Sequence, residues 1–436
     1  EHGLRPDDYG IGAIEEWSRW HAGFDIWLSD RVLALAFDLR YGKTRRDQPD
    51  EMALIEKIAK ADSVADAMAT LVHSTGRYQR LRRALRQHRR LAESGGWPAI
   101  PDGPTIGPDS DDPRIAVLRK RLAASGDMAV FDVAIPAYDL ALEAAVRRFQ
   151  KRHGLDIDGL VGKKTLRALN VPVEQRIDQI RINLERQRWI DASATADYIL
   201  VNVPAFRAYV YLDGQLRWTT RVIVGEPEDK TPLFQSELNS VIFNPTWSVP
   251  YSIASEEMLP KIQRDPDYLR RGNYLVFDRS GTEIDPGSVD WSVIRQNTFP
   301  YTIRQQAGPG NELGQIKFLF PNPYSVCMHD TQGKALFDRA RRSLSHGCIR
   351  VDEPQYMAEV MLARQGWTSA DVHGRLRSGE TSAVALETPV PIALVYWTAD
   401  VDDEGTLYFY EDIYDRDTPL RAALDAVSVS ERIVTE

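Results

Sequence analysis

Hydrophobic positions in the first hundred residues follow the three- and four-residue spacing of helices. Apolar side chains with this spacing stand at Ile14, Trp17, Trp20, Phe24, Trp27 and Leu28. The spacing predicts an aromatic-rich helix face that packs into a core. A second helix is predicted from Ser63 to His73, because Ser63 and Asp66 suit its first turn.

An arginine-rich segment follows. Seven arginines lie between Arg77 and Arg90, around Tyr78, Leu81 and Leu85. Such a charge run is typical of a helix with one solvated face, and contact with an anionic surface is the alternative interpretation. Residues 95–113 are rich in Gly, Pro and Asp, which indicates a boundary. We therefore expect a helical domain over residues 1–108.

A compact helical unit is predicted at residues 109–170. Its two apolar stripes consist of Ile115, Leu118, Leu122, Leu142, Ala145 and Phe149. A turn-rich segment at Asp156–Gly162 then precedes a short helix that carries Leu166 and Leu169. The two stripes and the short helix indicate a small domain of three helices.

From Tyr198 the hydrophobic period changes from that of a helix to that of a strand. Apolar residues alternate along residues 199–203, and Asp213-Gly214 between two β-rich runs predicts a hairpin. Further strands are expected at residues 316–320, 325–329, 392–398 and 407–410, the last two completing the sheet. A helix is expected near residues 353–363. Residues 251–307 break the strand pattern with a helical stretch at 253–264 and a Trp- and Tyr-rich stretch.

Composition narrows the class of protein. A chain of 436 residues predicts two or three domains, and 43% hydrophobic with 27% charged residues is typical of a globular protein. A net charge of −9 argues against a nucleic-acid partner, which would need a basic surface. There is no run of about 18 apolar residues, so no spanning helix is expected. The start at Glu1, without an apolar leader, suggests a trimmed export signal or anchor.

The candidate chemistry centres on His329 and on the run Ser345-His346-Gly347-Cys348. Eighteen residues separate His329 from Cys348, enough to leave one strand and return beside it. A free thiol has a pKa of about 8.5, and a neighbouring imidazole can take its proton. The glycine suits a tight turn whose backbone N–H groups face a developing oxyanion. This pattern predicts a cysteine nucleophile for acyl transfer.

Two other interpretations stay open at this point. His329, Asp330, His346 and Cys348 offer nitrogen, oxygen and sulfur ligands that could hold zinc. Alternatively, the cysteine is a small buried hydrophobe and the histidines are structural. Serine hydrolase and zincin chemistry have no motif here, because the sequence lacks Ser-x-x-Lys, Gly-x-Ser-x-Gly and any His-Glu pair.

The spacing of these residues resembles a known family. A histidine, a gap of fifteen residues and Ser345-His346-Gly347-Cys348 are similar to the signature of the L,D-transpeptidase (YkuD-like) family. Arg350-Val351 and the run Asn244–Pro250 resemble its large YcbB-like branch. The similarity extends from about Tyr198 to about Asp415. Many shorter members carry asparagine at the position of Arg350.

A second resemblance covers residues 109–170. Ala145–Gln150, His153-Gly154-Leu155, Asp158-Gly159 and Thr165-Leu166 are similar to the three-helix peptidoglycan-binding domain. In resembling proteins this unit is inserted into a helical scaffold, which here would continue at residues 171–195. The resemblance implies an α+β multidomain protein with a mainly-β catalytic domain at 196–425, a lid insertion at about 251–307 and a tail at 426–436.

The resemblance implies a peptidoglycan L,D-transpeptidase that forms 3→3 crosslinks from tetrapeptide stems with release of D-alanine. Cys348 would be the nucleophile, His329 the base, and Gly347 with Cys348 the oxyanion donors. His346 and Ser345 would support the site. The implied substrate-binding residues are Arg350, Trp247, Tyr324 and Asp330. The alternatives are an L,D-carboxypeptidase with the same site, or an inert peptidoglycan-binding protein.

The same resemblance implies no cofactor and no metal, and acylation of Cys348 by carbapenems. The implied partners are peptidoglycan stem peptides and glycan, with other cell-wall synthases as further candidates, and the implied location is the periplasm. The second cysteine, Cys327, stands on the predicted strand 324–329. It should therefore share a face with His329 at a distance of about 7 Å. It is either a packing residue near the site or a partner for a reversible disulfide with Cys348.

Overall fold

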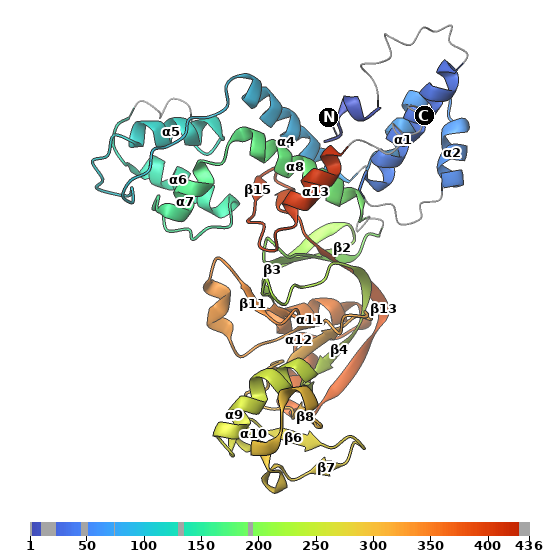
Figure 1. Cartoon of the computed structure of the whole chain (residues 1–436), viewed down its shortest axis with the longest axis vertical. Coiled ribbons are helices and arrows are strands. Elements are labelled where there is room, and N and C mark those ends of the chain that lie inside the picture. Colours follow the sequence, from blue (N-terminus) through green and yellow to red (C-terminus); the bar gives the residue numbers. More distant parts are fainter. Residues whose placement is uncertain are drawn as a thin grey trace. The chain divides into compact units, whose positions relative to one another are not determined.

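The computed structural model describes residues 2–9, 23–44, 51–73, 75–129, 135–190 and 195–426. The chain divides into two compact units, which are described separately (Figure 1). The helical unit comprises Glu1–Ala194, Asn202–Ala205 and Tyr396–Glu436, and the sheet unit comprises Thr195–Val201 and Phe206–Val395. Within the described ranges, no helix is long and apolar enough to cross a membrane. All but the first residue of the expected tail at 426–436 lies outside the described residues.

The helical unit contains most of the helices. Its elements are η1 (Pro6–Tyr9), α1 (Phe24–Tyr41), α2 (Glu51–Ala59), α3 (Val64–Leu71), α4 (Gly76–Glu93), α5 (Ile115–Ala124), α6 (Leu140–Arg152), α7 (Lys163–Leu169), α8 (Val173–Arg188), β14 (Ala399–Val401), β15 (Leu407–Phe409) and α13 (Asp417–Asp425).

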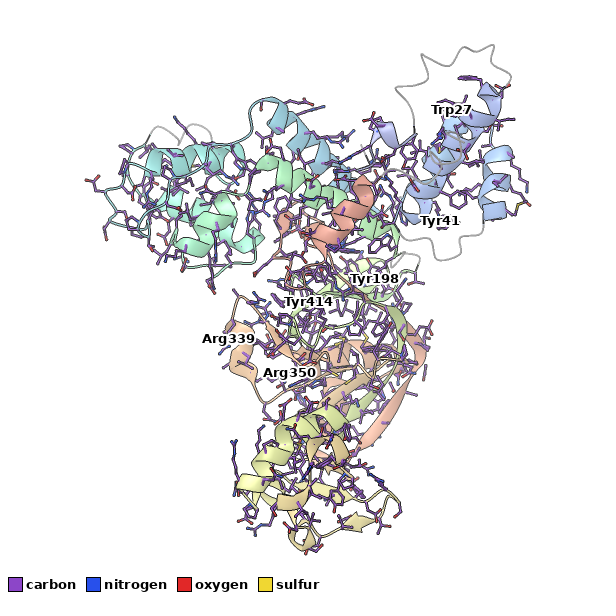
Figure 2. All side chains as sticks on the ribbon, in the orientation of Figure 1. Trp27, Tyr41, Tyr198, Arg339, Arg350 and Tyr414 are labelled. Atoms are coloured by element: carbon purple, nitrogen blue, oxygen red, sulfur yellow. The ribbon has the colours of Figure 1, made fainter. Side chains whose placement is uncertain are left out.

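Helix α1 carries only the second half of the predicted aromatic face, since Ile14, Trp17 and Trp20 lie outside the described residues. Figure 2 labels Trp27 near the start of α1 and Tyr41 at its end. Trp27 is half-buried, but Leu28 is 37% exposed, so the predicted core role is wrong for Leu28. The buried part of the helix lies one to three turns later, where alanine and leucine pack against α3 and η1.

Helices α3 and α4 confirm the helices predicted in this region. The Ser63 hydroxyl accepts a hydrogen bond from the Asp66 amide at 3.1 Å and caps α3. In α4 the apolar residues Tyr78, Leu81 and Leu85 are fully buried against α8, while none of the arginines is buried and three of them, Arg83, Arg86 and Arg90, are exposed. The spacing of three and four residues therefore separates a core face from a basic face.

Helices α5, α6 and α7 pack as the predicted three-helix domain. Both predicted stripes are buried in one apolar cluster together with Leu166 and Leu169. The turn before α7 is held by Gln150, which donates to the Asp158 carboxylate at 2.7 Å and accepts from the Gly159 amide at 2.9 Å. Gly159 has a φ of +75°, a conformation that favours glycine.

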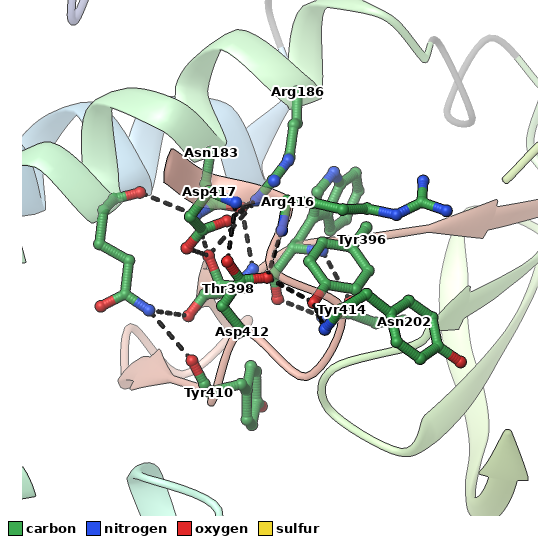
Figure 3. A network of polar contacts seen from close by, with 12 residues as sticks. Asn183, Arg186, Asn202, Tyr396, Thr398, Tyr410, Asp412, Tyr414, Arg416 and Asp417 are labelled. Carbon is green, nitrogen blue, oxygen red and sulfur yellow. Dashed lines mark hydrogen bonds and ion pairs between the residues drawn. The ribbon is translucent and has the colours of Figure 1, made fainter. Parts of the chain in front are cut away.

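A buried polar network joins α8 to the C-terminal segment within the helical unit (Figure 3). Thr398 lies at its centre: its amide donates to the Asn183 side chain at 2.9 Å, and its hydroxyl donates to Asp417 at 2.7 Å. Arg186 forms an ion pair with Asp417 at 2.5 Å, and Gln179 donates to the Thr398 carbonyl at 2.8 Å. Because buried polar groups must find partners, this network holds the C-terminal segment against α8.

The strand at residues 407–410 does not complete the main sheet, so that expectation is wrong. β15 pairs only with β14, antiparallel, in a separate two-stranded sheet. The turn between them is tight, because the Asp402 amide donates to the Thr406 carbonyl and the Thr406 amide donates to the Asp402 carboxylate. A local hairpin satisfies these backbone groups without any distant strand.

The sheet unit is built on nine strands in the order β11-β3-β12-β10-β9-β4-β13-β1-β2, and β2 also pairs with β3. The strands are β1 (Tyr198–Asn202), β2 (Arg207–Leu212), β3 (Gln215–Gly225), β4 (Gln235–Phe243), β9 (Ile316–Leu319), β10 (Met328–His329), β11 (Ser343–Ser345), β12 (Ile349–Val351) and β13 (Ser382–Val395). The β2–β3 hairpin turns at Asp213 and Gly214, both with positive φ, as predicted.

Helices lie between the late strands of this unit. η8 (Lys334–Asp338) follows β10, and α11 (Pro354–Leu362), η9 (Ala363–Gln365) and α12 (Ser369–Ser378) precede β13. Helix α11 matches the predicted helix near 353–363, whereas α12 has no counterpart in the prediction. Its N-terminus carries a capping box in which Thr368 and Asp371 exchange hydrogen bonds.

The segment that interrupts the strand pattern folds around its own core. It contains β5 (Trp247–Ser248), η4 (Ile253–Met258), α9 (Leu259–Arg264), α10 (Tyr268–Arg271), β6 (Tyr274–Phe277), β7 (Glu283–Ile284), η5 (Pro286–Ser288), η6 (Trp291–Val293), η7 (Gln296–Thr298) and β8 (Thr302–Gln305). Four of its strands form a sheet in the order β5-β8-β6-β7, which Figure 1 colours yellow to gold. Its apolar cluster includes Met258, Trp291 and Phe299. We call residues 247–305 the insertion.

The predicted fold class is confirmed. A mainly-β region, a helical N-terminal region and a small three-helix domain are all present.

Candidate active site

The candidate site lies where β10 and β12 run side by side in parallel. Their register pairs His329 with Arg350, and the Ile349 amide donates to the Cys327 carbonyl at 3.0 Å. Cys327 therefore lies opposite Cys348, two residues before the pair of His329 and Arg350 along the two strands. Because side chains alternate along a strand, all four side chains project from the same face. The two sulfur atoms are 3.8 Å apart.

Strand β9 extends this row on the other side of β10. Its register pairs Lys317 with His329, so Lys317, His329 and Arg350 lie abreast on three neighbouring strands. His329 is only 5% exposed, whereas the two cations are half-buried (Arg350 is labelled in Figure 2). A buried imidazole thus lies between two positive charges.

Hydrogen bonding fixes the tautomer of His329. Its Nδ1 lies 2.5 Å from the Asp330 carbonyl, which can only accept, so Nδ1 carries the hydrogen. Burial, and then the charges of Arg350 and Lys317, lower the pKa of His329 to about 4. The ring is therefore neutral near pH 7, and the lone pair of Nε2 is free to take a proton.

His329 and Cys348 are diagonal neighbours and are not hydrogen-bonded to each other. Their strands are about 4.8 Å apart and they differ by two residues along the strand, so their Cα atoms are about 8 Å apart. This spacing leaves room for a reacting group between thiol and imidazole. Catalytic hydrogen bonds in unliganded enzymes are often long and form only around the substrate.

The thiol of Cys348 is the acidic member of the cysteine pair. A hydrogen bond from the Cys327 thiol lowers the pKa of Cys348, and the charges of Lys317 and Arg350 lower it further, against the opposing effect of burial. The same hydrogen bond and burial raise the pKa of Cys327, which is 5% exposed. Cys327 therefore stays protonated, and its hydrogen bond stabilises the thiolate that forms when Cys348 loses its proton.

The loop that carries Cys348 is held from behind by the turn after β3. The buried Thr231 hydroxyl donates to the Gly347 carbonyl at 2.9 Å and accepts from the Gly225 amide at 2.9 Å. Ser345 donates to the Cys348 carbonyl at 2.5 Å. Gly347 has a φ of +101°, which requires glycine. These contacts fix the loop before any substrate binds.

The backbone amides of this loop are left available. Among the described residues, neither the Gly347 nor the Cys348 N–H has a hydrogen-bond acceptor. Backbone donors next to a nucleophile can stabilise the negative oxygen of a tetrahedral intermediate. The pair fits the predicted oxyanion donors.

The side chain of His346 contacts the insertion. Its Nε2 lies 2.8 Å from a carboxylate oxygen of Glu257 on η4, and both side chains are about half-exposed. Glu257 was not among the residues singled out from the sequence. The contact links the nucleophile loop to the insertion.

Among the described residues, no group of three or more His, Cys, Asp or Glu side chains could hold a metal ion.

The remaining predicted residues differ in their surroundings. Both carboxylate oxygens of Asp330 are engaged, by the Thr331 and Gln315 amides at 2.7 and 2.9 Å and by Lys334 at 2.7 Å. Trp247 is half-buried against the core of the insertion. Tyr324 is 54% exposed, with its ring 5.3 Å from that of Phe234.

The sequence did not indicate Lys317 or Thr231. Lys317 stands on a predicted strand, but which residue of β10 it faces depends on a register between distant segments. Thr231 lies in a turn with no periodic pattern, and only its contacts with the nucleophile loop reveal its role.

Comparison with known proteins identifies three regions of the chain. Residues 196–392 match the YkuD model, described as "L,D-transpeptidase catalytic domain", residues 111–169 match "Putative peptidoglycan binding domain", and residues 1–85 match "Scaffold domain". A Haemophilus influenzae protein named "Putative L,D-transpeptidase" is 37% identical over 225 residues, 52% of this chain and 45% of that protein. The chain thus spans less than half the length of this relative.

Solved structures of the same class are more distant. An L,D-transpeptidase from Stackebrandtia nassauensis is 13% identical, covering 68% of this chain and 96% of its own, with a TM-score of 0.26. One from Mycobacterium smegmatis is 12% identical over 46% of this chain and 58% of its own, with a TM-score of 0.22. The sequence matches therefore support the assignment more strongly than the solved structures do: residues 196–392 match the model of the L,D-transpeptidase catalytic domain, and residues 111–169 match the model of the peptidoglycan-binding domain.

Proposed function

We propose that this protein is a peptidoglycan L,D-transpeptidase that forms 3→3 crosslinks by cysteine acyl transfer. Cys348 attacks the carbonyl between the diamino acid at position three of a tetrapeptide stem and its terminal D-alanine. D-alanine leaves, and an amine of a second stem resolves the thioester. The observation that carries this proposal is an acidic, half-buried thiol beside a neutral imidazole and two unoccupied backbone N–H groups.

His329 serves the two half-reactions in turn. Its free Nε2 takes the proton of the Cys348 thiol and passes it to the departing amine of D-alanine. The ring is then neutral again and takes a proton from the incoming amine. Because the pKa of His329 lies well below neutrality, the ring is unprotonated at the start of each half-reaction. The N–H groups of Gly347 and Cys348 stabilise the oxyanion in both steps.

Arg350 and Lys317 fit the substrate's charge. Among the described residues, neither cation makes a hydrogen bond or an ion pair, although both are half-buried next to Cys348. The terminal D-alanine carries a carboxylate one residue beyond the scissile bond. We assign that carboxylate to this pair, and place Trp247 and Tyr324 farther along the substrate. Asp330 supports the site by holding the chain after β10.

The insertion acts as a lid. This proposal is supported by the contact between Glu257 on η4 and His346, which joins the insertion to the loop that carries Cys348. Closure of such an element excludes water and so favours an amine over hydrolysis. This feature supports the transpeptidase over the carboxypeptidase alternative.

The helical unit supports binding of the protein to the peptidoglycan polymer. A cavity of about 860 Å³ lies among α4, α6 and β15, and four of its lining residues are the cations Arg90, Arg148, Lys151 and Arg152. Arg152 is paired with Asp127, whereas Arg90 and Lys151 are exposed and have no ion pair among the described residues. Stem peptides carry carboxylates, so we propose that this cavity holds them. A substrate of this kind implies the periplasm as the site of action.

Incubation of purified muropeptides with the protein, followed by mass spectrometry, tests the proposed reaction. Crosslinked dimers with release of D-alanine are expected, and Cys348→Ala should yield none. Trimmed tripeptides without dimers would identify an L,D-carboxypeptidase, and unchanged muropeptides would leave only a binding protein. A carbapenem should form an adduct on Cys348. An adduct on Cys327 instead would contradict the assignment of the nucleophile.

A sedimentation assay with cell-wall sacculi tests the cavity. Lys151→Glu together with Arg90→Glu should weaken co-sedimentation while leaving reaction with small soluble muropeptides intact. Lys163→Glu together with Lys164→Glu, the same change of charge at two exposed lysines outside the cavity, is the matched control.

A further inference from the structure

The candidate site contains two thiols, and the acyl-transfer reaction needs only one of them. Cys327 and Cys348 are the two cysteines of the chain, and both are free. Their sulfur atoms lie 3.8 Å apart. The parallel register places their Cα atoms about 4.8 Å apart, and disulfides join Cα atoms between about 4.4 and 6.8 Å apart. The backbone therefore already meets the requirement for a bond between them.

The two sulfurs differ in access and in acidity. Cys327 is 5% exposed, so an oxidant in solution reaches Cys348 first. Cys348 is also the more acidic thiol, because Cys327 donates to it and two cations lie near it. Thiolates react with peroxides and thiols do not, so the first oxidation falls on Cys348.

We propose that Cys327 and Cys348 form a redox-active pair in which Cys327 resolves an oxidised Cys348 as an intramolecular disulfide. The modification goes beyond the proposed transpeptidation, since it depends on the reactivity of the thiol and not on a peptidoglycan substrate. It silences the nucleophile reversibly and protects it from irreversible oxidation.

The chemistry takes two steps with a peroxide as oxidant. The Cys348 thiolate attacks one peroxide oxygen, the O–O bond breaks, and Cys348 becomes a sulfenic acid while the other oxygen leaves as an alkoxide or hydroxide. The Cys327 sulfur then attacks the Cys348 sulfur: an S–S bond forms, the S–O bond breaks, and the hydroxyl leaves with the Cys327 proton as water. Two thiols lose two electrons and one peroxide gains them. A dithiol reductant reverses the change.

A packing role explains the burial of Cys327 but not its placement. A small apolar residue such as alanine or valine would fill a buried strand position next to Met328 equally well. The side chain instead meets the sulfur of the candidate nucleophile at hydrogen-bonding distance. Because the pair is intramolecular and preformed, resolution should outpace the attack of a second peroxide on the sulfenic acid.

Peroxide titration read by intact-mass and peptide-mapping spectrometry tests the pair in the full chain. The wild-type protein should lose two hydrogens, give one linked peptide containing Cys327 and Cys348, and return to its starting mass with dithiothreitol. Cys327→Ser keeps a hydrogen-bond donor of similar size but cannot form the bond. It should gain one oxygen and then two or three, and dithiothreitol should not reverse the higher states.

Cys348→Ser is the matched control, and it should resist the same peroxide dose because its remaining thiol is buried. The proposal is overturned if the wild-type protein accumulates oxygens without the linked peptide, or if Cys327→Ser is restored by dithiothreitol as fully as the wild type. The readout is mass and not turnover. A failure of the transpeptidase proposal would therefore leave this result unaffected, and the reverse also holds.

Discussion

Each unit of the molecule contains a cluster of buried or half-buried polar groups, and the two clusters differ in how completely their members are partnered. In the helical unit, the amide, hydroxyl and carbonyl of Thr398 all have partners, and Arg186 has the carboxylate of Asp417 (Figure 3). In the sheet unit, Arg350 and Lys317 lie beside Cys348 with no ion pair among the described residues.

This contrast distinguishes polar residues that form a site from polar residues that only stabilise the fold. A fully satisfied network stabilises one conformation and has no capacity left for a ligand. Groups that are half-buried, charged and unpaired cost stability, and they are retained where a substrate supplies the missing partner. Substitutions in the two clusters, and a change of pH, should therefore have different effects.

The largest effect is expected for His329→Ala. Loss of the base that serves both half-reactions should lower turnover by about 10²- to 10⁴-fold. Steady-state crosslinking of muropeptides measures it, with circular dichroism to verify the fold. Thr398→Val in the other cluster is the control, and it should leave turnover on small soluble muropeptides within about twofold of the wild type. A His329→Ala enzyme with full activity would remove the histidine from the mechanism.

Asp417→Ala should destabilise the helical unit strongly. It leaves the buried guanidinium of Arg186 without its carboxylate, a loss that costs about 3–5 kcal/mol. Hydrogen exchange read peptide by peptide separates this unit from the sheet unit, whose protection should not change. Asp403→Ala, which breaks the half-exposed ion pair with Arg80, is the matched control and should cost less than about 1 kcal/mol. Equal effects of the two changes would contradict the contrast.

Acid should destabilise both units through their neutral histidines. The pKa of His329 is about 4 in the folded chain, below its ordinary value of about 6.5, so the unfolded state binds more protons between those values. The stabilisation is complete above about pH 6.5 and is lost as the pH falls toward 4, up to about 3 kcal/mol. In the helical unit, burial likewise lowers the pKa of His88 to about 4.

Hydrogen exchange at a series of pH values measures the acid slope, which is the decrease in stability of each unit as the pH falls. His329→Gln should flatten it for peptides of the sheet unit. In the helical unit, where burial also lowers the pKa of His153, His88→Gln should make it less steep without removing it. If His329→Gln left the acid slope of the sheet unit as steep as in the wild type, the imidazole would not be the neutral group inferred here.

The smallest effect is expected for Lys317→Met. Removing one cation beside Cys348 should raise the pKa of its thiol, and a shift of about one unit lowers the thiolate fraction about tenfold below that pKa. The pH dependence of alkylation by iodoacetamide reports it. Lys261→Met, at an exposed lysine of the insertion, should leave the profile unchanged. An unchanged profile in Lys317→Met would assign the acidity to Cys327 and Arg350 alone.

Local patterns were sufficient to predict much of the fold. The buried stripes of α5 and α6, the Asp213-Gly214 hairpin and the cap of α3 each depend on residues close in sequence. The motif also indicated Cys348 and His329. Their roles stay proposals, but the structure brings both onto one face of neighbouring strands.

Features that depend on which strands pair and in what register were not predictable. The neighbour of β15 was wrongly expected to be the main sheet, because a short apolar strand does not specify its partner. Lys317 and Glu257 are ordinary surface-type residues in the sequence, and only the register of β9 and the fold of the insertion bring them to the site. A one-residue shift in register would have turned Lys317 to the opposite face.

The insertion also bears on the order in which the sheet unit assembles during synthesis. It begins and ends on two strands that pair directly, since Trp247 on β5 is opposite Gln305 on β8. Beyond it, β4 pairs with β9, where Ser240 is opposite Leu319. If the insertion collapses first around its own core, its closed ends bring β4 and β9 together. The pairing of β4 with β9 then costs only the loop-closure entropy of a short loop, although a long stretch of chain separates the two strands. This step of folding should therefore be nearly as fast as the pairing of strands that are close in sequence.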